Sequence, residues 1–386
     1  MKFDMVFEGG GAKGMAFVGA MRALEDKGHT SGRLIGTSAG AITATLIAAG
    51  YSAGMMENAL GEIDEKGRPV FENFMDRPKA KDYTAEDIEN SVTMKCFKSI
   101  DIPLVPERVE KKLDELILKG LLKLRAYPVL FSFVERGGLY LGNAFLDWMR
   151  RKLDEVKEGY AAMTMQEFFE ATGRDLSLVA SDTVSQDMLV LNHRTAPNCP
   201  VSWAVRMSMS IPFAWHEVIW QPGWDPYRTF DPSGRTVHKE VSLAGHAIVD
   251  GGALSNFPID KLTSDEPSVR AVMGDAAPDR KAVLGLLIDE TLKVEGAPPP
   301  PLEDDDDDAG VAGDIKKLRT VRRVSRLLNT MMQAHDKQLI AANNDLICRL
   351  PAKEYGTMEF DMTEARKKAL VDAAQNAMIK HLAGRA

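Results

Sequence analysis

Two glycine-rich segments near the start of the sequence carry residue types that could do chemistry. EGGGAKG covers residues 8–14, and GTSAG covers residues 36–40. GTSAG fits the Gly-x-Ser-x-Gly nucleophile elbow, a tight strand-to-helix turn that holds a serine hydroxyl clear of the backbone. Ser38 is therefore a candidate nucleophile. Gly36 and Gly40 fit the motif because a side chain at either position would collide with the neighbouring strand or helix.

A pattern with three fixed positions also recurs by chance in long chains, so the elements around it decide its value. The apolar run RLIG leads into GTSAG, and the segment AITATLIAAG predicts a helix that ends at Gly50. Such a helix directs its positive N-terminal end at Ser38 and stabilises negative charge near the hydroxyl. This order of elements favours a nucleophile over a chance match.

The glycine loop has to be compared with two nucleotide-binding motifs. Gly9, Gly11 and Gly14 satisfy the Gly-x-Gly-x-x-Gly dinucleotide fingerprint. That fingerprint expects an acidic residue at the end of the second strand, where this chain has residues 36–38. A P-loop needs a lysine followed by serine or threonine after its last glycine, whereas Lys13 precedes Gly14 here. The sequence therefore completes neither nucleotide motif.

The third interpretation of the glycine loop is an oxyanion hole. Consecutive glycines let the backbone N–H groups of Gly10 and Gly11 turn toward one point. A helix expected over residues 15–27 would add its positive end beside them. The runs FDMVF and RLIG precede the two loops, and a parallel sheet places the C-terminal ends of such strands on one edge. We therefore expect both loops at one site.

A serine nucleophile needs a base, and none of the chain's seven histidines lies in a motif. An α/β-hydrolase places its histidine late, so His335 and His381 stay open on chain order, although the elbow of that fold follows several strands. The segment AIVDGGALSNFPID instead puts Asp250 at the end of an apolar run, before Gly251 and Gly252. The alternative interpretation of this segment is an ordinary Asp-Gly turn.

The sequence resembles the patatin-like phospholipase family in four segments that follow the family's order: EGGGAKG, GTSAG, AVRMSMSIPF at 204–213 and VDGGALSNFP at 249–258. The resemblance extends from about residue 3 to the C-terminus. It implies a serine acyl hydrolase that uses a Ser-Asp dyad without histidine. Carried over by position, Ser38 is the nucleophile and Asp250 is the base.

The resemblance also assigns the residues around the dyad. Gly10 and Gly11 form the oxyanion hole, with Gly9 shaping the turn. The matching positions that support the site are Lys13, Gly14, Gly36, Gly40, Gly251 and Gly252. The segment with Ser208, Ser210 and Pro212 matches one that supports the site in the family, and we assign it a packing role.

A Ser-Asp dyad imposes its own chemistry. A carboxylate with a reference pKa of about 3.9 is a weak base, so the proton must leave the hydroxyl as the acyl carbonyl is attacked. Burial of Asp250 would raise its pKa and make it a better acceptor. Water then repeats the cycle on the acyl-Ser38 ester. Neither step needs a metal, and no His, Cys or carboxylate cluster has ligand spacing, so we expect no metal and no cofactor.

Composition restricts partners and location. The chain has 386 residues, 45% hydrophobic and 27% charged, with a formal net charge of −8. This charge gives no reason to expect nucleic acid as a partner, and any transient membrane contact should be apolar or local. Three widely spaced cysteines suit a reducing compartment. With no signal segment and no run of about 20 apolar residues, we expect a cytoplasmic protein, although an exported effector would look the same.

The chain predicts one α/β domain over residues 1–386, with a mainly parallel central sheet sandwiched by helices and a helical insertion at 51–142. Residues 105–124 have amphipathic helical spacing, favouring a surface helix over a lid at 105–134 that opens at a lipid surface. The apolar stretch 127–134 could supply part of an acyl channel. Residues 296–313, with four prolines and five consecutive aspartates, predict a solvated loop.

These observations favour hydrolysis of fatty-acyl esters. The family resemblance puts phospholipids or lysophospholipids first as substrates, with a neutral-glyceride lipase or general carboxylesterase as the alternative. A non-catalytic lipid-binding or signalling scaffold is the alternative of another class, and a nucleotide-dependent oxidoreductase is a third. Head group, acyl position, regulatory partner and oligomeric state are not encoded in these motifs.

Overall fold

The structure is a computed structural model of the whole chain. It describes residues 1–98, 120, 127–230, 238–299, 323 and 336–385. The expected amphipathic helix at 105–124, and with it most of the lid expected at 105–134, lies outside these residues, as does the acidic run within 296–313. Both therefore stay predictions, as does the division of the chain into a single domain with an insertion.

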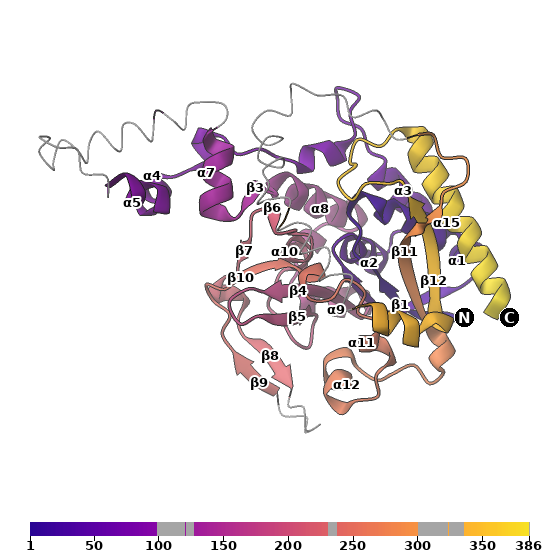
Figure 1. The fold of residues 1–386 in the computed structure, drawn as a ribbon. Coiled ribbons are helices and arrows are strands. Elements are labelled where there is room, and N and C mark those ends of the chain that lie inside the picture. The colour runs from indigo at the N-terminus through magenta and orange to yellow at the C-terminus, as the bar shows by residue number, and fades with distance from the viewer. Residues whose placement is uncertain (99–119, 121–126, 231–237, 300–322, 324–335, 386) are drawn as a thin grey trace, which may run out of the picture.

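A mixed sheet forms the centre of the fold (Figure 1). Its strand order is β12-β11-β1-β2-β4-β10-β7, with β5 beside β4. The strands are β1 (Lys2–Phe7), β2 (Thr30–Thr37), β4 (Leu176–Asp182), β5 (Asp187–Leu191), β7 (Val218–Ile219), β10 (Ala247–Asp250), β11 (Val283–Lys293) and β12 (Ile347–Lys353). β12, β11, β1, β2 and β4 run parallel, whereas β5, β10 and β7 add antiparallel pairs at one side. The prediction of a mostly parallel α/β sheet is confirmed.

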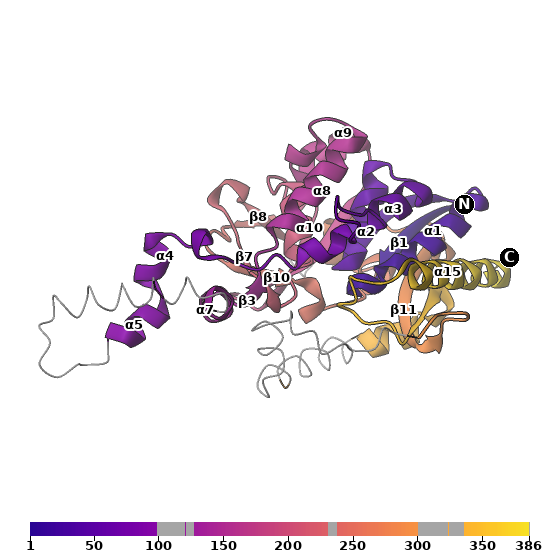
Figure 2. The ribbon, with the colours of Figure 1, turned by 90° about the horizontal axis from the view of Figure 1, so that it is seen from above.

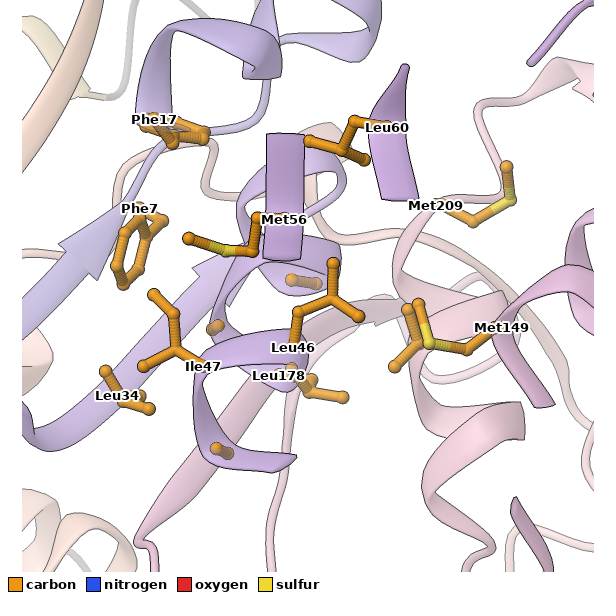
Figure 3. Close-up of a cluster of buried hydrophobic side chains, with 14 of the residues drawn as sticks. Phe7, Phe17, Leu34, Leu46, Ile47, Met56, Leu60, Met149, Leu178 and Met209 are labelled. Carbon is orange, nitrogen blue, oxygen red and sulfur yellow. The ribbon is translucent and has the colours of Figure 1, made fainter. Parts of the chain in front are cut away.

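The central strands are buried on both faces, as continuous apolar runs predict. In β1, Phe3, Met5 and Phe7 join the apolar cluster on one face, and Val6 joins the cluster on the other. Figure 3 shows the larger cluster, in which Phe7 gathers with side chains of β2, β4 and the neighbouring helices. The strand ends that carry the loops are therefore fixed by packing on both sides.

Helices cover both faces of the sheet (Figures 1 and 2). The larger cluster includes α1 (Ala16–Asp26), α2 (Ala39–Ala49), α3 (Ala53–Leu60), α8 (Asn143–Val156), α9 (Met165–Thr172), α10 (Val201–Ser208) and α15 (Glu364–Arg385). The opposite face is covered by α11 (Asp260–Thr263) and α12 (Pro267–Met273). Almost every residue of α2 is buried, which identifies α2 as a central helix.

In both views α4 (Ala85–Asn90) and α5 (Val92–Lys98) stand away from the body, and α7 (Tyr127–Arg136) lies between them and β3. The three helices share an apolar cluster that contains Ile88, Met94 and Phe131.

The smaller strands are β3 (Gly138–Tyr140), β6 (Phe213–Trp215), β8 (Tyr227–Phe230) and β9 (His238–Val241). The short 3-10 helices are η1 (Gly11–Met15), η2 (Val70–Phe74), η3 (Ala80–Asp82), η4 (Tyr160–Ala162), η5 (Pro222–Trp224), η6 (Gly251–Ala253), η7 (Arg280–Ala282) and η9 (Asn344–Leu346).

Candidate active site

The GTSAG segment forms a sharp turn between a strand and a helix. β2 ends at Thr37 and α2 begins at Ala39, so Ser38 alone makes the turn. Its backbone has φ 53° and ψ −119°, a conformation that costs a non-glycine residue on the order of 1–3 kcal/mol. A Cβ on Gly36 would overlap the backbone of Gly40, so a turn this tight requires glycine there.

Hydrogen bonds hold this strained turn in place. The Ser38 N–H donates to Ser208 Oγ at 3.1 Å, and that hydroxyl donates to the Val179 carbonyl at 2.6 Å. Ser208 is the last residue of α10, whose inner face packs on β4. The segment 204–213 therefore does more than the expected packing, because it ties the elbow to the central sheet.

Strand register places Asp250 beside the elbow. Thr37 at the end of β2 pairs with Val179 of β4, and the next β4 residue, Ala180, pairs with Asp250 at the end of β10. Ser38 and Asp250 thus flank β4 at the same level. The Asp250 N–H donates to the Ser210 carbonyl at 2.9 Å, so the segment that fixes Ser38 also fixes Asp250.

The Asp250 carboxyl group is buried and only partly satisfied. It is 1% exposed, and its Oδ1 accepts from the Gly252 N–H at 2.7 Å. Burial raises the pKa of Asp250 to about 7, although the nearby Ser38 hydroxyl and the Gly252 N–H favour the charged form and lower that pKa. Its Oδ2 makes no hydrogen bond of ordinary geometry. A carboxylate with one free, desolvated oxygen beside a serine can accept that serine's proton.

The pKa of Asp250 leads to a testable pH profile. A general base acts in its deprotonated form, so kcat/KM for ester hydrolysis should rise about tenfold per pH unit below pH 7 and level off above it. Initial rates with a soluble ester between pH 5 and 9 measure this profile. A plateau that already begins at pH 5 would mean that the base has an ordinary carboxyl pKa.

The glycine loop presents two unused N–H groups next to Ser38. The N–H groups of Gly9 and Ala12 donate to the carbonyls of Asn256 and Thr357, at 3.0 and 2.9 Å. In the described part of the chain, the N–H groups of Gly10 and Gly11 have no acceptor. Two free donors of this kind can stabilise an oxyanion.

Close contacts explain why this loop is built from glycine. A Cβ on Gly9 would lie 3.2 Å from the Ser38 Cβ, which shows how near the loop passes to the elbow. Gly11 has φ +57°, and a Cβ there would overlap the Thr357 carbonyl. A Cβ on Gly14 would lie 2.8 Å from Ala39, at the start of α2.

A Gly11→Ala substitution tests the role of the loop. The methyl group would strain the positive φ and push the loop off the Thr357 carbonyl, which misaligns both free N–H groups. We expect kcat/KM to fall about 10²–10³-fold, the typical effect of losing an oxyanion donor. Gly28→Ala is the matched control, because Gly28 also has a positive φ but open space around its Cα. Equal losses in both variants would contradict the assignment.

Two ionisable side chains, Lys13 and Glu8, hold the glycine loop in place. Lys13 is 3% exposed and forms an ion pair with Glu290. Glu8 is half-buried, and desolvation raises its pKa to about 8; its Oε2 accepts from the Ile288 N–H at 2.6 Å. Both side chains therefore anchor the loop to β11. Lys13 has a structural role in this arrangement, and Glu8 is a residue to which the sequence motif assigned no role.

The sequence motifs also did not indicate the role of Arg206, a buried arginine on α10. Arg206 donates to the carbonyls of Leu141 and His216, at 2.8 and 3.1 Å, and to the Ser210 hydroxyl. Burial lowers its pKa to about 10. Arg206 therefore ties the connection between β3 and α8 to the segment that holds the dyad. The only feature of the sequence that could have indicated this role of Arg206 is a charged residue on the inner face of an apolar helix.

An apolar pocket opens beside the elbow and the glycine loop, with a volume of about 490 Å³ including its open mouth. Its lining residues are Gly11, Ala12, Gly14, Met15, Ala39, Ile42, Thr43, Leu60, Phe71, Glu359, Phe360, Met362 and Lys367. None of these comes from residues 127–134, which lie in α7. The acyl-channel stretch expected from the sequence is therefore not part of this pocket.

The far wall of the pocket comes from the loop between β12 and α15. Arg366, 1% exposed, holds this loop by donating to Glu359 Oε1 at 2.6 Å and to the carbonyls of Pro298 and Glu354, both at 2.7 Å. The same loop supplies the Thr357 carbonyl that accepts the Ala12 N–H. The C-terminal quarter of the chain therefore both lines the pocket and shapes the glycine loop.

Within the described residues, no group of three or more His, Cys, Asp or Glu side chains could hold a metal ion. The same residues contain no helix that combines the length and the apolar character needed to cross a bilayer.

The fold and this arrangement define a class of protein. The sequence profile of the family described as patatin-like phospholipase matches residues 5–263, more than half of the chain, so the protein belongs to this family of lipid acyl hydrolases. Residues 264–386, which complete the pocket, lie beyond the matched region.

The sequence identity between this chain and individual relatives is low. The chain is 27% identical over 380 residues to the uncharacterized protein YqhO of Bacillus subtilis, covering 96% of this chain and 95% of that protein. It is 29% identical over 164 residues to a patatin-like phospholipase domain-containing protein of Cryptococcus neoformans, covering 41% of this chain and 17% of that protein. Among solved structures, VipD from Legionella pneumophila has a TM-score of 0.45 and 16% identity, over 99% of this chain and 67% of VipD.

Proposed function

We propose that the protein hydrolyses fatty-acyl esters of phospholipids or lysophospholipids, with Ser38 as nucleophile and Asp250 as base. The observation that carries this proposal is the juxtaposition of a strained serine elbow with a buried carboxyl group whose Oδ2 is free and whose pKa is raised to about 7. Structural ion pairs do not explain that carboxyl group, because no cation lies among the causes of its shifted pKa.

In the acylation step, Ser38 Oγ attacks the ester carbonyl carbon while its proton passes to Asp250. The carbonyl oxygen becomes negative and accepts hydrogen bonds from the N–H groups of Gly10 and Gly11, with the N-terminal end of α2 adding positive potential. The intermediate collapses, the bond to the alcohol breaks, and the proton leaves with the alcohol. The acyl group then remains on Ser38.

The apolar pocket supports a lipid acyl chain as the group transferred. Its side chains Leu60, Phe71, Phe360 and Met362 offer a surface that an alkyl chain can bury. Ala39 and Gly11 place its entrance next to the reacting centre. The charge of Glu359 in the wall is neutralised by Arg366, so the pocket presents no free carboxylate to the chain.

A neutral-glyceride lipase or general carboxylesterase would use the same dyad and pocket, so substrate profiling has to separate these activities. We propose incubating the purified protein with phosphatidylcholine, lysophosphatidylcholine, triacylglycerol and a short-chain ester, and measuring products by mass spectrometry. Release of free fatty acid from either phospholipid, absent in Ser38→Ala, supports the proposal. Hydrolysis of triacylglycerol or the short ester alone would support the alternative, and no hydrolysis at all would support a lipid-binding scaffold.

We also propose that the protein acts in the cytoplasm and contacts membrane surfaces transiently to reach its substrate. Cys199 and Cys348 are buried and form no disulfide bond, which suits a reducing compartment. Fractionation of cells that make the protein, with and without a dedicated secretion system, would separate this site of action from export as an effector.

A further inference from the structure

Asn256 follows the Asp-Gly-Gly turn and lies against the glycine loop. Its backbone carbonyl accepts the Gly9 N–H at 3.0 Å, and its backbone N–H donates to Asp336 Oδ2 at 2.8 Å. A Cβ on Gly9 would overlap Asn256 Oδ1 and would lie 3.2 Å from the Ser38 Cβ. The amide oxygen and the serine side chain therefore border the same small space.

The orientation of the Asn256 amide is fixed by its neighbours. Nδ2 donates to the Gly9 carbonyl at 3.0 Å and to Glu8 Oε1 at 3.3 Å. Rotating the amide by 180° would place its oxygen against the Gly9 carbonyl oxygen, and neither of these two atoms can donate a hydrogen bond. The hydrogen-bond network therefore requires that Oδ1 be the atom on the Ser38 side.

Asn256 Oδ1 has no hydrogen-bond partner although it is fully buried. Across the described residues, only two buried side-chain oxygens share this state, Asn256 Oδ1 and Asp250 Oδ2, and both border Ser38. Leaving a buried acceptor without a partner destabilises a protein, so two such acceptors at one place point to a donor that arrives during the reaction. A group with two O–H bonds would satisfy both.

We propose that Asn256 Oδ1 and Asp250 Oδ2 together hold the water that hydrolyses the acyl-Ser38 ester. This inference rests on the proposed function. One O–H of the water donates to Asn256 Oδ1 and the other to Asp250 Oδ2, which directs the oxygen lone pair at the acyl carbonyl carbon. Asn256 is thereby a further catalytic residue, specific to the deacylation step.

Deacylation forms one bond to the carbonyl carbon and breaks another. The water oxygen bonds to the carbonyl carbon, and its proton passes to Asp250 Oδ2. The tetrahedral intermediate then collapses, the bond between the carbonyl carbon and Ser38 Oγ breaks, and the proton on Asp250 moves to Oγ. The products are a free fatty acid and the resting enzyme, and the Asn256 amide is unchanged because it only accepts a hydrogen bond.

The test separates the two half-reactions. With a p-nitrophenyl ester, kcat/KM reports acylation, whereas kcat reports deacylation when deacylation is slow. In Asn256→Ala we expect kcat and KM to fall together by about tenfold while kcat/KM stays within about twofold. Intact-protein mass spectrometry of a rapidly quenched reaction should then show an increased fraction of acylated enzyme. A fall in kcat/KM equal to the fall in kcat, with no acyl-enzyme, would overturn the inference.

Two further variants separate the acceptor from its surroundings. Asn256→Asp keeps an oxygen at the Oδ1 position but loses the two amide donors, so its ratio of kcat to kcat/KM should stay near that of the wild type. Accumulation of acyl-enzyme in this variant would overturn the inference even if Asn256→Ala fails to fold. Ser255→Ala is the neighbouring control, because the Ser255 hydroxyl contacts Asp336 at 3.4 Å, and it should not accumulate acyl-enzyme.

The outcomes also distinguish this inference from the proposed function. If Ser38 is not the nucleophile, Ser38→Ala retains hydrolysis and no variant carries an acyl group on residue 38. If Ser38 is the nucleophile and Asn256 only supports the loop, Asn256→Ala loses both half-reactions together.

Discussion

Replacing Ser38 by alanine is expected to lower kcat for ester hydrolysis by at least about 10⁴-fold, because the oxygen that bonds to the acyl carbon is removed. The fold should persist, since the elbow is held by backbone contacts to Ser208 and by α2, none of which uses the Ser38 hydroxyl. Alanine also removes a polar group buried at a positive φ, so the thermal midpoint should change little. Steady-state rates and thermal unfolding of the same preparation measure both effects.

The matched control for this experiment is Ser202→Ala on α10. The Ser202 hydroxyl is buried as well, but it donates to the Ala161 carbonyl at 3.2 Å. Its loss should leave activity near that of the wild type. Full activity in Ser38→Ala would show that another residue attacks the ester.

Asp250→Asn should lower kcat by about 10⁴-fold and at the same time stabilise the protein above pH 7. The amide cannot accept the serine proton, so catalysis is lost. Burial raises the folded-state pKa of Asp250 from 3.8 to about 7, so the wild type loses stability as pH rises through this range and the buried carboxylate forms. Asparagine removes that cost, and we expect a gain of about 2–4 kcal/mol in the free energy of unfolding at pH 8.

The direction of this stability change at pH 8 distinguishes a functional role of Asp250 from a purely structural one. Urea unfolding at pH 5 and pH 8 should show the stability difference between variant and wild type at the higher pH and a much smaller one at the lower pH. A residue that only supported the fold through its Gly252 contact would instead destabilise the protein at both pH values when replaced. Loss of stability at pH 8 would therefore contradict the role of Asp250 as a strained, functional carboxylate.

The sequence predicted the elements of the site that depend on local chemistry. Ser38 and its flanking glycines form one turn, and the glycine loop packs against it, because a sharp turn and close backbone approach can be satisfied only by particular residue types. Asp250 was found through its Asp-Gly-Gly neighbours, and strand register brings it level with Ser38. These signals lie within a few residues of the group concerned.

The parts that the sequence did not predict depend on contacts between distant segments. The Thr357 carbonyl meets Ala12, and Phe360 and Met362 line the pocket, although more than 300 residues separate them from the glycine loop. Nothing in the local pattern of the loop between β12 and α15 indicates a site. The same holds for Asn256, whose importance follows from which of its atoms has no partner and not from its residue type.

The measurement that tests the central claim most directly is covalent labelling with a long-chain alkyl fluorophosphonate, followed by peptide mass spectrometry. This reagent reacts with an activated serine hydroxyl and leaves a stable adduct on its oxygen. The juxtaposition of Ser38, Asp250 and the free N–H groups of Gly10 and Gly11 predicts one adduct per chain, on Ser38, which disappears in Ser38→Ala and forms far more slowly in Asp250→Asn. An adduct on any other residue, or no adduct in a preparation that hydrolyses esters, would contradict it.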